Sequence, residues 1–230
     1  MRAGENMDKD DKRRLKDVKT GLYMITAICG LVDAVCFLAL GGVFAEMMTG
    51  NLLLMAFSIG MPGHGDSARY VPAILAFSLG ALLGGRLLRG PAKWQERRIG
   101  FAVEWLVILA ATAVAWRGDP DAHNLAGQAV VTLLSFAMGI QNATVRIHGV
   151  PDLATNVMTV TFTAIIADSK AAGGDNKNWT RRVTSVGLFC VSAAVGAFLL
   201  RFGTVWPLVL ASVVFSLAMI PLLLGEKRLA

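Results

Sequence analysis

Residues 30–60 read GLVDAVCFLALGGVFAEMMTGNLLLMAFSIG. A long apolar run ends at the glycine pair Gly41-Gly42, and a second apolar segment extends from Glu46 to Gly60. A membrane-spanning helix needs about 20 mostly apolar residues, so the second segment is short for a full crossing. Because glycine pairs interrupt helices, the stretch predicts a membrane helix followed by a half-helix. That half-helix is either a short span or a segment that re-enters the bilayer.

The rest of the chain has the composition of a multi-spanning helical membrane protein. Hydrophobic types make up 55% of the 230 residues and charged types only 17%, whereas soluble domains have about 25% charged residues. Six runs are apolar enough to cross a bilayer: 22–40, 71–88, 100–116, 125–147, 183–201 and 204–224. These runs predict an all-α membrane protein. The net charge of +6 comes from residues beside the runs, which indicates contact with anionic membrane lipid and no nucleic-acid partner.

A second short segment, residues 152–168, follows the span 125–147 as residues 46–60 follow the first span. Because cytoplasmic loops are enriched in Lys and Arg, the basic residues discriminate between topologies. If both short segments cross, 15 of the 22 basic residues are cytoplasmic. If both re-enter, 19 are cytoplasmic, and only Arg69, Arg117 and Arg201 lie outside. The pattern predicts two re-entrant half-helices and cytoplasmic N- and C-termini.

The two halves of the chain are similar to each other in sequence. At an offset of 109 residues, Gly30 matches Gly139, Asp33 matches Asn142 and Ala34 matches Ala143. At an offset of 112, Phe77 matches Phe189, Ala81 matches Ala193 and Gly84 matches Gly196. We therefore divide the chain into a basic cytoplasmic tail (1–20), a first membrane repeat (21–117) and a second (118–230). Each repeat has three crossings, an odd number, so the sequence predicts an inverted 3+3 repeat, as in many transporters.

Polar residues are concentrated where the predicted repeats meet near the middle of the bilayer. The candidate path residues are Asp33, Thr49, Gly50, Asn51, Gln141, Asn142, Arg146, Thr155, Asn156 and Thr159. Half-helix ends can bind the polar groups of a solute, but their side chains could equally cap the helix and bond to neighbouring helices. Both alternatives remain open from the sequence.

Three charged residues near or within the spans have two interpretations each. Asp33 lies well inside the first span, where a carboxylate costs roughly 2.5–3.5 kcal/mol, so it should face the protein interior. It could bind a proton, a cation or the solute, or only pair with another group. Arg146 could pair with Asp33 or extend to the cytoplasmic interface. Glu104 could face the interior, but we expect it to reach back to the membrane surface.

Other residue types suggest no chemistry. Cys29, Cys36 and Cys190 all lie in apolar runs and are expected to be buried hydrophobic side chains. They lack the spacing of metal ligands, so no metal site and no cofactor are expected. The chain also lacks the motifs of serine hydrolases, zinc proteases and P-loop enzymes, and we expect no enzymatic activity.

The quoted stretch from Gly30 to Phe44, followed by Met48-Thr49-Gly50-Asn51, resembles the signature of the YoaK family. These are bacterial inner-membrane proteins grouped by a domain of unknown function. Residues 136–143, followed by 154–159, resemble the family's second motif, although Val160 stands where glycine is common. The resemblance covers residues 20–225 and implies a helical inner-membrane protein without implying a substrate.

The expected function is a transporter or channel for a small polar or ionic solute, with proton coupling through Asp33 as one option. Its partners would be membrane lipid, the solute and a second copy of the chain in a homo-oligomer. The alternative is a non-transporting scaffold in which the small-residue stripes serve oligomerisation and the polar residues only join helices.

Overall fold

The computed structural model describes residues 9–61, 66–87, 93–148, 158–176 and 178–226. All regular secondary structure in these ranges is helical, which confirms the predicted all-α fold. The α-helices are α1 (Lys9–Leu38), α2 (Met48–Gly60), α3 (Tyr70–Leu87), α4 (Lys93–Gly118), α5 (Leu125–His148), α6 (Met158–Ala167), α7 (Trp179–Leu199) and α8 (Val205–Glu226). Three short 3-10 helices are η1 (Ser67–Arg69), η2 (Lys170–Ala172) and η3 (Leu200–Phe202).

Six of the described helices are long and apolar enough to cross a membrane, as the sequence predicted. The candidate spans are Lys19–Leu38, Ser67–Leu87, Arg98–Gly118, Leu125–Arg146, Trp179–Phe202 and Val205–Leu222. They differ from the predicted runs by a few residues at either end. The two remaining apolar helices, α2 and α6, are shorter.

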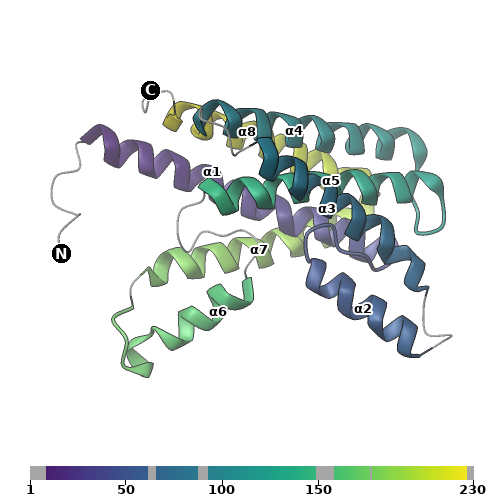
Figure 1. Ribbon diagram of the computed structural model, residues 1–230, viewed down its shortest axis with the longest axis horizontal. Coiled ribbons are helices and arrows are strands. Elements are labelled where there is room, and N and C mark those ends of the chain that lie inside the picture. Colours follow the sequence, from purple (N-terminus) through teal and green to yellow (C-terminus); the bar gives the residue numbers. More distant parts are fainter. Residues whose placement is uncertain (1–8, 62–65, 88–92, 149–157, 177, 227–230) are drawn as a thin grey trace.

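The two short helices do not cross the molecule. The start of α1 and the end of α8 lie at the same end of the bundle, where Gly21 packs against Leu222 (Figure 1). Helices α2 and α6 begin near the middle of the molecule and run toward opposite ends (Figure 1). Each ends on the side where the preceding long helix also ends. That both short helices re-enter the membrane stays a prediction, and the segment that leads into α6 lies outside the described residues.

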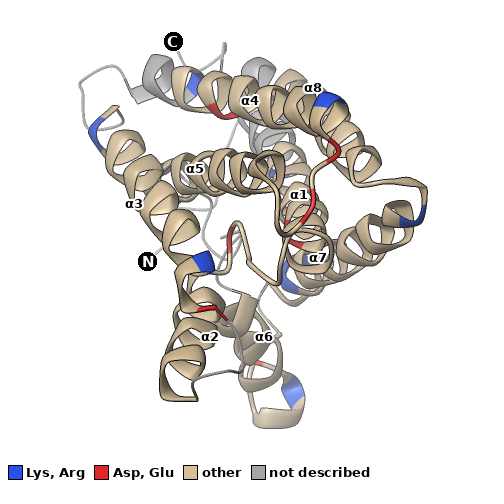
Figure 2. Cartoon of the chain, turned by 90° about the vertical axis from the view of Figure 1, so that its right-hand side faces the viewer, with Lys and Arg blue, Asp and Glu red and all other residues tan. Residues whose placement is uncertain are grey.

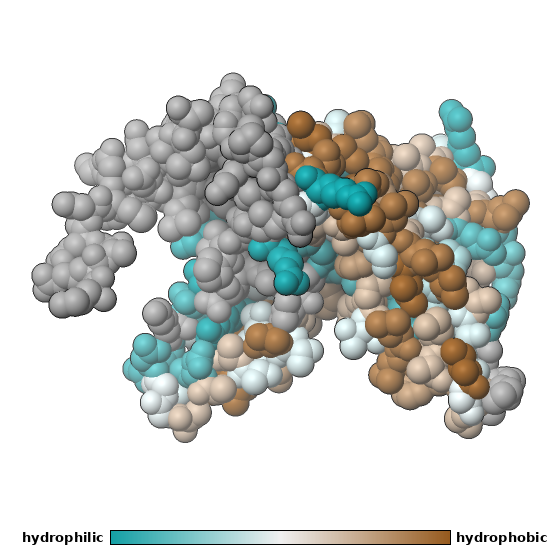
Figure 3. Space-filling model, viewed as in Figure 1, coloured by the Kyte–Doolittle hydropathy of each residue, from teal (hydrophilic) through white to brown (hydrophobic). Residues whose placement is uncertain are grey.

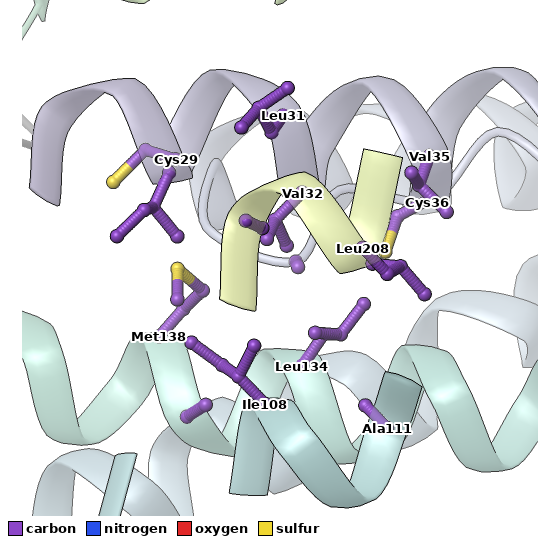
Figure 4. Packing of buried hydrophobic residues seen from close by; sticks show 14 of the residues in the cluster. Cys29, Leu31, Val32, Val35, Cys36, Ile108, Ala111, Leu134, Met138 and Leu208 are labelled. Atoms are coloured by element: carbon purple, nitrogen blue, oxygen red, sulfur yellow. The ribbon is translucent and has the colours of Figure 1, made fainter. Parts of the chain in front are cut away.

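The core of the bundle surrounds α1 and α5. Figure 4 shows Val32 of α1 beside Met138 and Leu134 of α5, with Ile108 of α4 and Leu208 of α8 on the same side. All five side chains are buried. Close packing of such residues takes the place of the hydrophobic effect that drives soluble cores, because lipid is as apolar as leucine.

Helices α3 and α7 instead expose apolar faces. Leu75, Leu79 and Leu82 of α3 are exposed, and Figure 3 shows the hydrophobic surface over this part of the molecule. Val191 and Phe198 of α7 are exposed in the same way. Such faces suit contact with lipid, and they would be unusual on a soluble protein. Cys190 also lies on this outer face, so the prediction that all three cysteines are buried was wrong for this one.

Glycines allow two pairs of helices to approach with their backbones in contact. A Cβ atom added at Gly30 of α1 would overlap Phe189 of α7, and one added at Gly139 of α5 would overlap Phe77 of α3. The next contacts along each pair also correspond. Gly196 of α7 lies against Leu31 and Ala34, and Gly84 of α3 lies against Ile140 and Ala143. The first span of each half therefore packs on the second span of the other half.

Candidate functional site

Residues 39–47 return the chain from the end of α1 into the bundle, where α2 begins. Gly41 and Gly42 have φ angles of +97° and +73°, a conformation that L side chains rarely adopt. The Nη1 atom of Arg69, the last residue of η1, donates a hydrogen bond of 3.0 Å to the carbonyl oxygen of Gly41. The glycine pair therefore forms the turn, and Arg69 holds it from outside.

Asp33 of α1 binds the inner part of this loop. Its Oδ1 atom accepts hydrogen bonds from the backbone N–H groups of Ala45 at 2.8 Å and Glu46 at 2.9 Å. Non-helical backbone is tolerated at membrane depth only where protein or water satisfies its polar groups. Asp33 is 5% exposed, so these contacts are inside the protein. The carboxylate therefore serves as the acceptor that allows the loop to lie within the bundle.

The Asp33–Arg146 ion pair considered from the sequence is not formed. Arg146 is exposed near the end of α5, as expected for a side chain that extends to the membrane interface. The Oδ1 atom of Asp33 is already occupied by backbone donors. The sequence did not reveal these donors, because they lie on a loop that folds back toward the helix.

Asn51 of α2 fixes the same loop through Phe44. Its Oδ1 accepts from the Phe44 N–H at 2.8 Å, and its Nδ2 donates to the Phe44 carbonyl at 2.7 Å. The side chain is fully buried. Asn51 thus pairs with both backbone groups of one loop residue, and the ring of Phe44 stacks on Phe37 at a centroid distance of 4.5 Å.

We expect Asn51→Ala to destabilise the protein by about 2 kcal/mol, because both backbone groups of Phe44 lose their partner in a buried environment. The thermal unfolding midpoint of the purified protein in detergent, followed by tryptophan fluorescence, measures this loss. Ser58→Ala is the matched control: the Ser58 hydroxyl bonds only to Leu54 of its own helix, so its midpoint should hardly move. Equal midpoints for the two variants would contradict the assigned role of Asn51.

A cavity of about 530 Å³ lies where the two half-helices begin. Its lining includes Met48, Thr49 and Gly50 of α2 and Met158 and Thr159 of α6. Figures 1 and 2 both place α2 and α6 on the same side of the bundle. The other lining residues are Glu46 and Met47 of the loop, Leu53 of α2, Phe77 of α3, Asn142 of α5 and Phe189 of α7. Both halves of the chain therefore contribute to one cavity.

The predicted path residues occupy different positions relative to this cavity. Thr49, Gly50, Asn142 and Thr159 line it. Asp33, Asn51 and Gln141 are buried but are not among its lining residues, and Arg146 is exposed. Gln141 donates from Nε2 to the Sγ atom of Cys29 at 3.0 Å, which joins α5 to α1. Thr155 and Asn156 lie outside the described residues.

Glu46 lines the cavity and has an ionisable side chain, but it is not one of the predicted path residues. It is 5% exposed, and neither carboxyl oxygen has a hydrogen-bond partner. The Cys29 thiol and the Asn142 amide lie beside it. One signal could have identified it: an acid directly after a helix-breaking glycine pair and before a half-helix must face the protein interior.

Glu104 of α4 is a second buried acid without a partner. It is fully buried, and both of its carboxyl oxygens lack hydrogen-bond partners. The expectation that it reaches back to the membrane surface was therefore wrong. An ionised Glu104 would be repelled by an ionised Glu46.

Glu46 is the one ionisable group among the described residues that line the cavity. No Lys, Arg or His is among its lining residues. The described residues contain no group of three or more His, Cys, Asp or Glu side chains suited to a metal ion. The site therefore provides one carboxyl group, an amide and two threonine hydroxyls within largely apolar walls.

A second cavity, of about 370 Å³, lies on the other side of the loop. Leu40, Gly41 and Val43 of the loop line it, together with Arg69 and His123. The same nine-residue loop thus borders both cavities, with Glu46 and Met47 lining the first. Asp33 and Asn51 fix the part of the loop that lies between the two cavities.

Comparison with known proteins agrees with this architecture. The chain is 25% identical over 190 residues to the UPF0700 transmembrane protein YoaK of Bacillus subtilis (strain 168), an alignment that covers 77% of this chain and 82% of that protein. No solved structure matches the chain. Residues 21–220 match the family described as "Protein of unknown function (DUF1275)". This match includes all six candidate spans almost completely, so the chain is a multi-pass membrane protein that belongs to the DUF1275 family, the family of YoaK.

Proposed function

We propose that the protein transports a small polar or ionic solute through the cavity between α2 and α6. The observation that carries this proposal is the 530 Å³ cavity at the adjoining starts of two half-helices, with Glu46 and Asn142 in its wall. Half-helix N-termini present unpaired N–H groups, and transporters built from discontinuous helices bind solutes at such ends. The volume falls within the range of about 300–1,000 Å³ typical of small-molecule sites.

The reciprocal helix contacts support an inverted repeat, a plan that many transporters share. Gly84 contacts Ile140 and Ala143, and Gly196 contacts Leu31 and Ala34. Each of these positions maps onto its counterpart by the offsets of 109 and 112 residues found in the sequence. Two inverted halves that exchange equivalent contacts can move against each other about a fixed site, which is the basis of alternating access.

The loop of residues 39–47 would be the barrier between the two cavities. A solute that passes from the 370 Å³ cavity to the 530 Å³ cavity has to move past Val43 and Glu46. Asp33, Asn51 and Arg69 hold the loop in place. On this proposal, the structure represents a closed conformation, and opening requires the loop to leave these partners.

The basic residues support an orientation in a bacterial inner membrane with both termini on the cytoplasmic side. The end of α3, the start of α4, the end of α5 and the start of α7 lie on the same side as the start of α1 (Figure 1). These helix ends carry Arg86, Arg98, Arg146 and Arg181. Because Lys and Arg are enriched in cytoplasmic loops, this side of the molecule would be the cytoplasmic side. The 370 Å³ cavity would then face outward, because Arg69 and His123 line it at the opposite end.

Access to Thr49 from both sides of the membrane tests the transport proposal without knowledge of the solute. Thr49→Cys, in a background with the three native cysteines replaced by Ala, should react with a membrane-impermeant methanethiosulfonate in vesicles. We expect labelling when the reagent is present only outside and also when it is present only inside, because a transport site alternates in access or connects both sides.

Leu79→Cys is the control for this labelling. Leu79 is exposed on the outer face of α3, where lipid should exclude a charged reagent. It should remain unlabelled from both sides. Labelling of position 49 from one side only, or from neither, would contradict a transmembrane path and leave the scaffold function as the better explanation.

A further inference from the structure

We infer that the cavity between α2 and α6 binds a monovalent organic cation, with the Glu46 carboxylate as its counter-ion and a proton as the competing ligand. This inference names the solute class for the proposed transport function and depends on that function for its biological meaning. Binding itself can be measured separately from transport.

Glu46 is a buried acid in the wall of the cavity. It is 5% exposed, and neither of its carboxyl oxygens has a hydrogen-bond partner. An ionised carboxylate in an apolar environment requires a partner of opposite charge, and otherwise it takes up a proton. The described lining residues provide no such partner, because none of them is Lys, Arg or His. The neutralising charge must therefore enter the cavity as a proton or as a cation.

The groups around Glu46 include no base among the described residues. The other titratable groups near Glu46 are Asp33 and Cys29 of α1 and Glu104 of α4, and none of them can supply a positive charge. Lining residues from α3, α5, α6 and α7 are uncharged. An ionised Glu46 therefore makes the cavity favour cations over anions, although helix N-termini alone would favour anions.

The apolar wall of the cavity favours an organic cation over a small metal ion. Phe77 and Phe189 both line the cavity, and they occupy equivalent positions in the two halves of the chain. Aromatic rings stabilise ammonium-type cations through their negative faces. The thioethers of Met48 and Met158 add polarisable, adaptable contacts. A cation with an apolar body would therefore satisfy both the carboxylate and the walls.

Tetraphenylphosphonium is a suitable probe for this class, and binding can be measured by calorimetry on the full chain in lipid nanodiscs, with empty nanodiscs as the baseline. We expect saturable binding whose affinity increases from about pH 5.5 to about pH 8.5, because the cation needs the deprotonated carboxylate. In weakly buffered solution, at a pH where Glu46 is protonated, the binding of each cation should release up to one proton. Neutral triphenylphosphine oxide should bind at least about 10-fold more weakly.

Two variants separate a binding role for Glu46 from a structural one. Glu46→Gln keeps the shape of the side chain and should reduce affinity at least about 30-fold and abolish the pH dependence. Glu46→Asp retains the charge and should restore pH-dependent binding. Undiminished binding by Glu46→Gln, equal binding of the neutral probe, or cation binding without proton release in the unmodified protein would each overturn the inference. These results leave the two-sided labelling of position 49 unaffected, so the two proposals can fail independently.

Discussion

Gly139→Ala is expected to destabilise the protein by about 3 kcal/mol or more and to reduce the yield of folded protein in the membrane. The added Cβ atom would overlap the carbonyl oxygen of Phe77 and approach the backbone nitrogen of Ala81 to 2.8 Å. Overpacking typically costs about 1–3 kcal/mol where side chains can adjust. Here the obstructing atoms belong to the backbone of α3, so relief requires the two helices to separate along their whole crossing.

The thermal midpoint in detergent and the fraction of monodisperse protein on size-exclusion chromatography measure this effect. Gly187→Ala is the matched control, because Gly187 also lies within a helix but has no atom within 4 Å of the added Cβ. That variant should be unchanged or more stable by up to about 1 kcal/mol, the helix propensity difference between alanine and glycine. A Gly139→Ala protein as stable as the Gly187→Ala protein would show that α3 and α5 are not in backbone contact.

The long apolar runs made most of the fold predictable. Run length alone identified six spans, and the glycine pair after Leu40 identified the first half-helix, because both depend on local composition. The pattern of basic residues then favoured re-entry over crossing. Side-chain positions such as that of Glu104 were harder to predict. A glutamate near a helix end can turn either way, and only the packing of α4 against its neighbours decides this.

The candidate site was less predictable than the fold, because depth in a run does not determine which atoms a side chain contacts. Asp33 stood out as the deepest acid in the sequence, whereas the structure uses its Oδ1 to hold a loop 12 residues further along. Glu46, at the end of that loop, is the acid that lines the cavity. Asp33 holds the loop and Glu46 lines the cavity because residues 39–47 fold back into the bundle. No periodic pattern in the sequence predicts this fold-back.

Asp33→Ala is expected to destabilise the protein by about 4 kcal/mol, because two buried N–H groups would lose a shared acceptor and each unsatisfied group costs about 1–3 kcal/mol. Asp33→Asn should lose less than half of this, since an amide oxygen can accept the same two hydrogen bonds. The thermal midpoints of both variants, measured beside Ser78→Ala, whose hydroxyl bonds only within α3, provide the comparison.

The difference between the two Asp33 variants distinguishes a loop-holding residue from a charge carrier. If Asp33 holds the loop through hydrogen bonds, Asp33→Asn leaves the labelling rate of a cysteine at position 49 the same as with Asp33 in place. Asp33→Ala increases this rate, because a freed loop no longer separates the two cavities. Asp33→Asn should also retain cation binding at Glu46, since it preserves the acceptor and the position of the Glu46 backbone. If instead Asp33→Asn were as unstable as Asp33→Ala, the charge of Asp33 would be the essential property and the loop would need another anchor.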